Sequence, residues 1–436
     1  MSLMLLGCIG FGMSLFYLVK QEDPDMVKYS WQVISSTISI FVAVLLFQAF
    51  NGVVEQWSEK GSVMRDLAVA LLQMLLWFLA LQVTLLGISH LSVDYEEGKV
   101  DTERMELNLK CWATLFGHIT GFAAINAFVI VQEHMCNTQP HGWRRLLTAT
   151  CVPAMAWAFL YVLERGAKMV RQKLAKEDKP QTEEADEIWE DLTEETEDDI
   201  VGLAVSFLLV QSIRYGIGGD LPNREGEEPE ALLISHDGVE TLLLFGFAMV
   251  FALFVLIRRR VGCIRKRCGR LAPQIGNVSA MSFAWCLYVT ALWIVSGTFK
   301  EELSGMEKET VIALLVTCVA LGMIFVLDKI ADSEATDKDL DQAIRAEVYA
   351  LAILIGFSWE KAFDVAVHSI SEKVTVLPQL MTKIILALIL ASVVIPAWRM
   401  HILPTILRLE HAEKAEEAAA HHSDGDDDTE EALLSE

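Results

Sequence analysis

The feature that most constrains this chain is a series of apolar runs, each about 20 residues long, the length that an α-helix needs to cross a bilayer. About eleven runs meet that criterion, and none has the strict alternation of barrel strands. The runs are 2–19, 30–51, 66–89, 109–131, 146–164, 200–217, 239–257, 278–299, 310–328, 345–367 and 379–398. The sequence therefore predicts an all-α, polytopic helical membrane protein with about eleven transmembrane helices.

The charge of the chain is separated from its apolar runs. Hydrophobic residues make up 53% of the 436 residues, yet the formal net charge is −24. The two properties are compatible if the apolar runs lie in lipid and the charges lie in loops and tails. The composition excludes a nucleic-acid binder, which anionic phosphates would repel, and an intrinsically disordered chain. The eight cysteines indicate no disulfide framework, because most of them lie within apolar runs.

The basic residues of the loops predict the orientation, because short cytosolic loops are enriched in lysine and arginine. A basic stretch follows the fifth run, and a second basic cluster follows the seventh run. This second cluster comprises Arg258, Arg259, Arg260, Arg265, Lys266, Arg267 and Arg270. It is also expected to contact anionic lipid head groups. With about eleven spans, the N-terminus is predicted outside and the C-terminus in the cytosol, in a membrane that the sequence does not specify.

Similar segments recur along the chain and indicate an internal repeat. Three runs end in related sequences, at 16–20, 161–165 and 325–329, and each is followed by an acidic linker. The next run in each case has a polar end, at Asn51, Arg214 and Lys361. The predicted unit is four helices and a linker, and an even number of helices makes the repeat parallel. The alternative is that helices of similar composition resemble one another without a repeat.

The repeat divides the chain into copies and acidic connections. The predicted parts are a first helix with its linker (1–29), one copy (30–176), an acidic loop (177–199), a second copy (200–344), a partial third copy (345–400) and an acidic tail (401–436). The loop is predicted to be cytosolic and either disordered or marginally helical, and the tail largely disordered. Because the first helix would be the last of a copy, a truncated gene model is a further hypothesis, which the sequence does not decide.

The tenth run carries ionisable side chains, which are costly in a membrane and are therefore functional candidates. Glu360, Asp364 and His368 lie four residues apart and share one helix face. In one interpretation they form a protonatable ladder or cation path, with Arg214 and Lys361 as counter-charges. In the other, Lys361 pairs with Asp364, Arg214 pairs with Glu360, and His368 lies at the membrane interface.

Polar residues of other runs extend this hypothesis. Asn51 and Arg214 correspond to Lys361 in the repeat, so we expect the three at a matching depth, facing one polar cavity. His118 lies deeper in its run, and two nearby glycines leave room for a neighbouring helix. A structural hydrogen bond is the expected role of His118, and a proton relay is the alternative.

The span count, the repeat and the polar cluster together predict a membrane transport protein, either a solute or cation carrier or a channel. The alternative is a non-transporting scaffold or complex subunit whose acidic loop and tail recruit cytosolic proteins. The sequence contains no nucleotide-binding, hydrolase or metalloprotease motif, so no enzyme, cofactor or metal site is predicted. The substrate and the oligomeric state are not specified.

Overall fold

The structure of the chain is a computed structural model. It describes residues 2–58, 62–94, 99–139, 142–175, 183–223, 226–260, 271–299, 303–332, 338–374, 376–412 and 415. These residues are almost entirely helical, which confirms the predicted all-α class. The strands among the described residues form a short antiparallel hairpin of β1 (Val93–Asp94) and β2 (Lys99–Val100).

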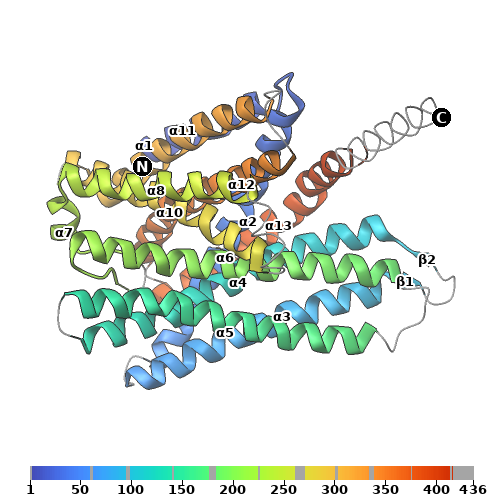
Figure 1. Ribbon diagram of the computed structural model, residues 1–436, viewed down its shortest axis with the longest axis horizontal. Helices are drawn as coiled ribbons and strands as arrows, with labels where there is room; N and C mark the ends of the chain where they lie inside the picture. The colour runs from blue at the N-terminus through green and yellow to red at the C-terminus, as the bar shows by residue number, and fades with distance from the viewer. Residues whose placement is uncertain are drawn as a thin grey trace, which may run out of the picture.

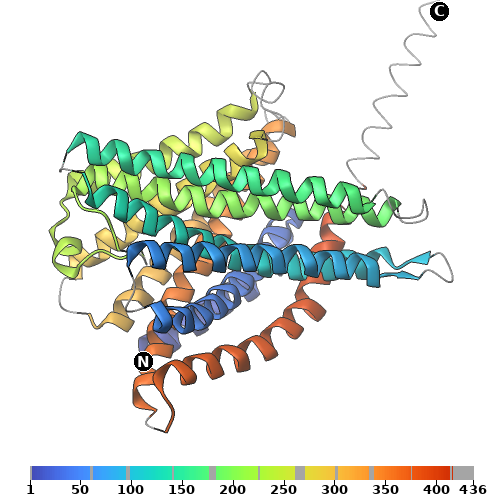
Figure 2. The ribbon, with the colours of Figure 1, turned by 90° about the horizontal axis from the view of Figure 1, so that it is seen from below.

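Most of the helices are long, and several run along the longest axis of the molecule (Figure 1). In chain order they are α1 (Ser2–Leu18), α2 (Pro24–Ser58), α3 (Val63–Leu91), α4 (Thr102–Asn137), α5 (Trp143–Ala175), α6 (Glu183–Gly218), α7 (Glu230–Ser235), α8 (Gly238–Arg260), α10 (Leu271–Phe299), α11 (Gly305–Ala331), α12 (Lys338–Lys373), α13 (Gln379–Ala397) and the π-helical turn η2 (Trp398–Ile402). Both ribbon views place α7 at one end of the molecule and the β1–β2 hairpin at the other (Figures 1 and 2).

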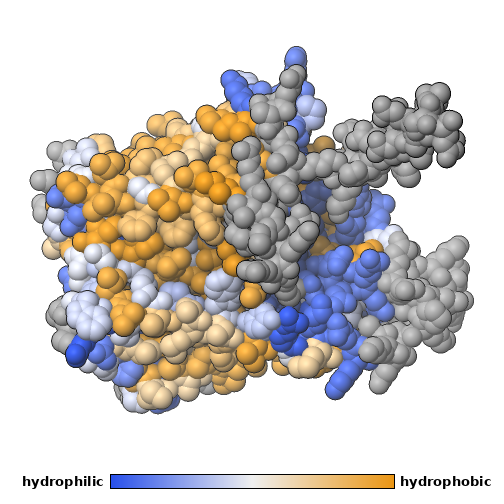
Figure 3. Space-filling view, viewed as in Figure 1, coloured by the Kyte–Doolittle hydropathy of each residue, from blue (hydrophilic) through white to orange (hydrophobic). Residues whose placement is uncertain are grey.

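Nine helices of the described part are long and apolar enough to cross a membrane. This is consistent with a multi-pass helical membrane protein. Two of the predicted spans are not among the nine: α1 has only 17 residues, and charged side chains interrupt the apolar run of α12. Apolar side chains cover much of the middle of the molecule, and hydrophilic side chains gather toward one end (Figure 3).

The interior is built from α2, α4, α6, α10 and α12, which pack on one another. Glycines let these helices approach closely. A Cβ atom on Gly356 of α12 would lie 2.8 Å from the Cα atom of Thr37 in α2. The glycines flanking His118, at 117 and 121, lie against Thr196 and Leu203 of α6. The expected close approach of a helix beside His118 is therefore present, and α6 provides it.

The acidic stretch predicted as a loop over 177–199 is instead helical from Glu183 onward and forms the first part of α6. Trp189 is only 3% exposed, and Glu197 forms a buried ion pair with Arg171 of α5 at 2.6 Å. Of the two predicted alternatives, disorder and a marginal helix, the structure shows a helix from Glu183 onward. Composition could not decide between them because it does not show where an acid finds a partner. Here α5 supplies both a packing surface and compensating cations.

The start of the predicted disordered tail is also ordered. The helix that begins at Gln379 continues through η2 to Ala412. Leu407 is buried, and Glu410 pairs with Lys110 of α4 at 2.5 Å. The rest of the predicted tail lies outside the described residues, except at position 415.

Candidate functional site

A cavity of about 600 Å³ lies between α2, α4, α12 and α13, with contributions from α6 and the following loop. Four of the predicted site residues line it: Asn51 of α2, and Glu360, Lys361 and Asp364 of α12. The structure therefore brings four of the predicted residues to one cavity, although they come from helices separated by about 300 positions in the sequence.

The charged lining of the cavity is predominantly acidic. Its carboxylates are Glu55, Glu133, Glu360 and Asp364, and its ammonium groups are Lys361 and Lys383. If all six are ionised, the lining carries an excess of two negative charges. Side-chain amides of Gln48, Asn51, Asn126 and Asn223 complete the polar surface. Such a lining favours a small, positively charged or zwitterionic occupant over an anion.

A chain of side-chain hydrogen bonds joins α4 to α2 in the cavity wall. Nδ2 of Asn126 donates to Oδ1 of Asn51 at 3.3 Å, and Nδ2 of Asn51 donates to Oε1 of Glu55 at 2.8 Å. The side-chain amide of Asn51 therefore accepts one hydrogen bond from Asn126 and donates another to Glu55. These bonds fix the positions of one carboxylate and two amides at the wall.

Glu360 is the most deeply buried carboxylate of the cavity, at 2% exposed. Its Oε2 atom has no hydrogen-bond partner among the described residues. A buried carboxylate oxygen without a hydrogen-bond donor raises the free energy of the folded protein, and a bound proton or cation would reduce this cost. Among the cavity carboxylates, Glu360 is therefore the one whose burial most disfavours an uncompensated negative charge.

Aromatic side chains form part of the cavity wall. Phe47, Phe122, Phe207 and Phe357 line it, and the rings of Phe122 and Phe357 are stacked with their centroids 6.4 Å apart. Behind them, the Trp285 ring lies edge-on to Phe357 at 4.6 Å.

The loop between α6 and α7 closes another side, and it involves two of the predicted residues. Adjacent glutamates hold it: Glu227 lies 3.6 Å from Lys361, and Glu228 pairs with Arg214 at 2.7 Å. Arg214 also donates from Nη1 to the carbonyl oxygen of Gly226 at 2.9 Å. The predicted pairing of Arg214 with Glu360 is therefore wrong, and Arg214 does not line the cavity but holds a loop beside it.

Glu228 is surrounded by donors from three elements. It accepts from Nε of Arg214 at 2.9 Å and from Nε1 of Trp293 at 3.1 Å, and Nε2 of His236 lies 2.9 Å away. The other ring nitrogen of His236 lies 2.8 Å from Glu240. Burial raises the pKa of Glu228, but Arg214 and His236 outweigh burial and hold that pKa below its ordinary value.

Two predicted histidines lie away from the cavity. His368 is half-exposed near the end of α12, 3.7 Å from Glu372 and 3.3 Å from Gln379. Although it shares a helix face with Glu360 and Asp364, it does not line the cavity with them. His118 is buried, and neither of its ring nitrogens has a hydrogen-bond partner among the described residues. The structural hydrogen bond expected for His118 is therefore not made to any residue that the structure describes.

The basic cluster after α8 falls largely outside what the structure describes. Arg258, Arg259 and Arg260 end α8, while Arg265, Lys266, Arg267 and Arg270 lie outside the described residues. Sequence reasoning also missed two cavity carboxylates, Glu55 and Glu133. Both lie just beyond an apolar run, where an acid is ordinary, so only the convergence of α2 and α4 distinguishes them.

Comparisons with protein-family models, with curated proteins and with solved structures found no match to this chain.

Proposed function

We propose that this protein is a membrane transport protein that moves a small cation through the cavity around Glu360. The observation that carries the proposal is the buried Oε2 atom of Glu360, which has no hydrogen-bond partner among the described residues and belongs to an acidic cavity. Ionisable residues inside a membrane bundle typically mark ion and proton pathways. A carboxylate that binds either a proton or a cation is suited to coupling their movements.

The parallel repeat is part of this proposal, and the packing of the helices supports it. α5 packs on α6 as α11 packs on α12 and α1 on α2, and α3 packs on α4 as α8 packs on α10. α12 in turn packs against α2. Three corresponding helices, α2, α6 and α12, would then surround the transport route, as sites at repeat interfaces do in other carriers.

The scaffold alternative receives less support. Its recruiting elements were the acidic stretch 177–199 and the acidic tail. Acids of the stretch engage other helices of the bundle, whereas most of the tail lies outside the described residues. Glu197 pairs with Arg171, and Asp199 accepts from Asn277 at 3.2 Å and from Tyr349 at 3.1 Å. Contacts of the basic cluster with anionic lipid remain part of the proposal, because membrane-edge cations attract such head groups.

The test is flux into proteoliposomes that contain the full chain, measured with radiolabelled sodium and rubidium and with an internal pH dye for protons. Glu360→Gln keeps the shape of the side chain but removes its charge, and it should lower flux of the transported cation about tenfold or more. Glu372→Gln is the matched control, because Glu372 lies on the same helix but is 60% exposed. Its flux should equal that of the unmodified protein.

Two results would contradict the proposal. One is equal flux in the Glu360→Gln and unmodified proteins. The other is that none of the three cations crosses faster than in empty liposomes, which would favour the scaffold. Size-exclusion profiles of both variants show whether the fold is retained, so a loss of flux can be attributed to the site.

A further inference from the structure

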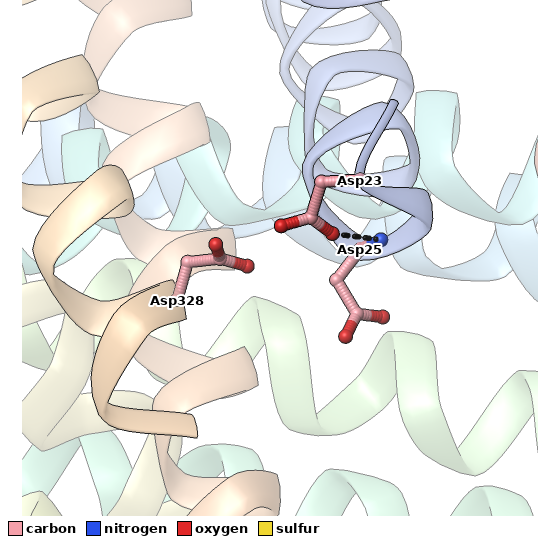
Figure 4. Close-up of side chains that lie close together, drawn as sticks. All are labelled: Asp23, Asp25 and Asp328. Carbon is pink, nitrogen blue, oxygen red and sulfur yellow. Dashed lines mark hydrogen bonds between the residues drawn. The ribbon is translucent and has the colours of Figure 1, made fainter. Parts of the chain in front are cut away.

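Three carboxylates converge where the start of α2 meets the end of α11, far from the cavity. They belong to Asp23 and Asp25 at the start of α2 and to Asp328 in the last turns of α11. One oxygen from each lies within 4.8 Å of the others. Figure 4 shows the carboxylates of Asp23 and Asp328 pointing toward each other from the two helices.

Asp23 alone has a simple structural role. Its Oδ1 atom accepts from the backbone N–H groups of Asp25 at 3.0 Å and Met26 at 3.4 Å, so it caps the first turn of α2. Capping accounts for one oxygen of Asp23. It does not account for Asp328, which comes from another helix.

Asp328 is in an unfavourable position by three criteria. It is 4% exposed, and its Oδ1 atom has no hydrogen-bond partner among the described residues. It lies near the C-terminus of α11, where the helix dipole disfavours negative charge. The charges of the other two aspartates and of Asp332 also act on it. A buried carboxylate in such surroundings requires a neutralising partner.

The lysines close in sequence do not balance this charge. Lys28 follows in the next turn of α2, and Lys329, which is exposed, follows Asp328. Even if both acted fully on the cluster, Asp332 and the three converging carboxylates would outnumber them. A proton shared between carboxylates or a bound cation would supply the missing positive charge.

We propose that Asp23, Asp25 and Asp328 bind a divalent cation of the calcium class. Hard divalent cations are held by carboxylate oxygens gathered from several positions, and this site gathers them from two helices. The cation would fasten the end of α11 to the start of α2. The inference does not depend on the proposed transport function, because Asp25 and Asn51 lie about 39 Å apart along α2 at 1.5 Å per residue.

The test uses the full chain in lipid nanodiscs after treatment with a chelator. The midpoint of thermal unfolding is followed during titration with calcium chloride, and potassium chloride of equal ionic strength serves as the salt control. Calcium should raise the midpoint of the unmodified protein in a saturable manner. Asp328→Asn is nearly isosteric and removes the buried charge, so the metal-free variant should unfold at the same or a higher temperature.

Asp328→Asn should weaken calcium binding at least about tenfold, because a buried charged ligand is lost. Asp332→Asn is the matched control. Asp332 lies four residues after Asp328, is exposed and does not belong to the cluster, so this variant removes the same charge outside the site. Its affinity should change by no more than about twofold. Both variants keep the other acidic residues of the chain, so weak binding to those residues would be the same in each.

The proposal is overturned if Asp328→Asn responds to calcium like the unmodified protein. It is also overturned if the unmodified protein does not respond to calcium, which is the result expected for a shared proton. Neither result bears on flux through the cavity, and loss of flux in Glu360→Gln does not bear on this site.

Discussion

Replacing Glu228 with alanine should destabilise the protein by about 3–5 kcal/mol, which is the usual cost of leaving a buried ionic partner uncompensated. The magnitude follows from what the change leaves behind. The Arg214 side chain is 4% exposed and loses its carboxylate, at 2.7 Å. Trp293 and His236 lose an acceptor at 3.1 and 2.9 Å. Water cannot easily replace these contacts, because Glu228 itself is 7% exposed.

The neighbouring residue is a matched control. Glu227 carries the same charge in the same loop, but its side chain is 57% exposed and its ion pair with Lys361 is longer, at 3.6 Å. Glu227→Ala should therefore cost no more than about 1 kcal/mol. The measurement is the free energy of unfolding in nanodiscs from denaturant titrations. Equal destabilisation by the two alanines would refute the assignment of Glu228 as the anchor of the loop.

The same anchor predicts a pH dependence. The pKa of Glu228 is held below its ordinary value of 4.5 in the folded protein. A carboxylate whose pKa is depressed on folding contributes stability above its unfolded pKa, and it loses that contribution as the pH falls through the folded value. Acidification from pH 6 to below about 4 should therefore reduce the stability difference between the unmodified protein and Glu228→Gln. A difference that grows on acidification would contradict this account.

Two further changes probe the packing of the bundle. Gly356→Ala should destabilise the protein by about 1–3 kcal/mol and lower its unfolding midpoint, because the added methyl group would overpack against the backbone at Thr37. Gly322→Ala is the control and should not lower the midpoint, because the space around Gly322 is open. Equal midpoints for the two variants would show that α2 and α12 can separate freely. Arg171→Met should destabilise the protein by about 3–5 kcal/mol in chemical unfolding, because it removes the cation that faces the buried Glu197 carboxylate. The double variant with Glu197→Leu should recover much of that loss.

Some of the candidate site could be anticipated from spacing within one helix. Glu360, Lys361 and Asp364 lie within two turns of α12, so their position on neighbouring parts of that helix follows from its periodicity. Asn51 was linked to them only through the repeat, and the structure places it in the same cavity. His368 shows the limit of the periodicity argument, because α12 extends beyond the cavity before reaching it.

The partners of these residues could not be anticipated. Arg214 was paired with Glu360 because both were charges within apolar runs, yet its partner, Glu228, lies in a connecting loop. The loop returns to α6 at Gly226, which adopts φ = +76°, a conformation that favours glycine. The local sequence pattern does not predict that the loop after α6 folds back on that helix.

The sequence by itself determined the class of this protein. Apolar runs of bilayer length, with most of the charge outside them, can satisfy their backbone groups in lipid as helices, and this holds whatever the helices contact. Only the tertiary structure decided which charges are paired and which are available. That choice depends on which helix faces meet, as when α5 orders the acidic start of α6 or α11 brings Asp328 to the start of α2. Burial then makes each ion pair, or the lack of one, energetically important. An unpaired charge costs little free energy in water but several kilocalories per mole inside the bundle.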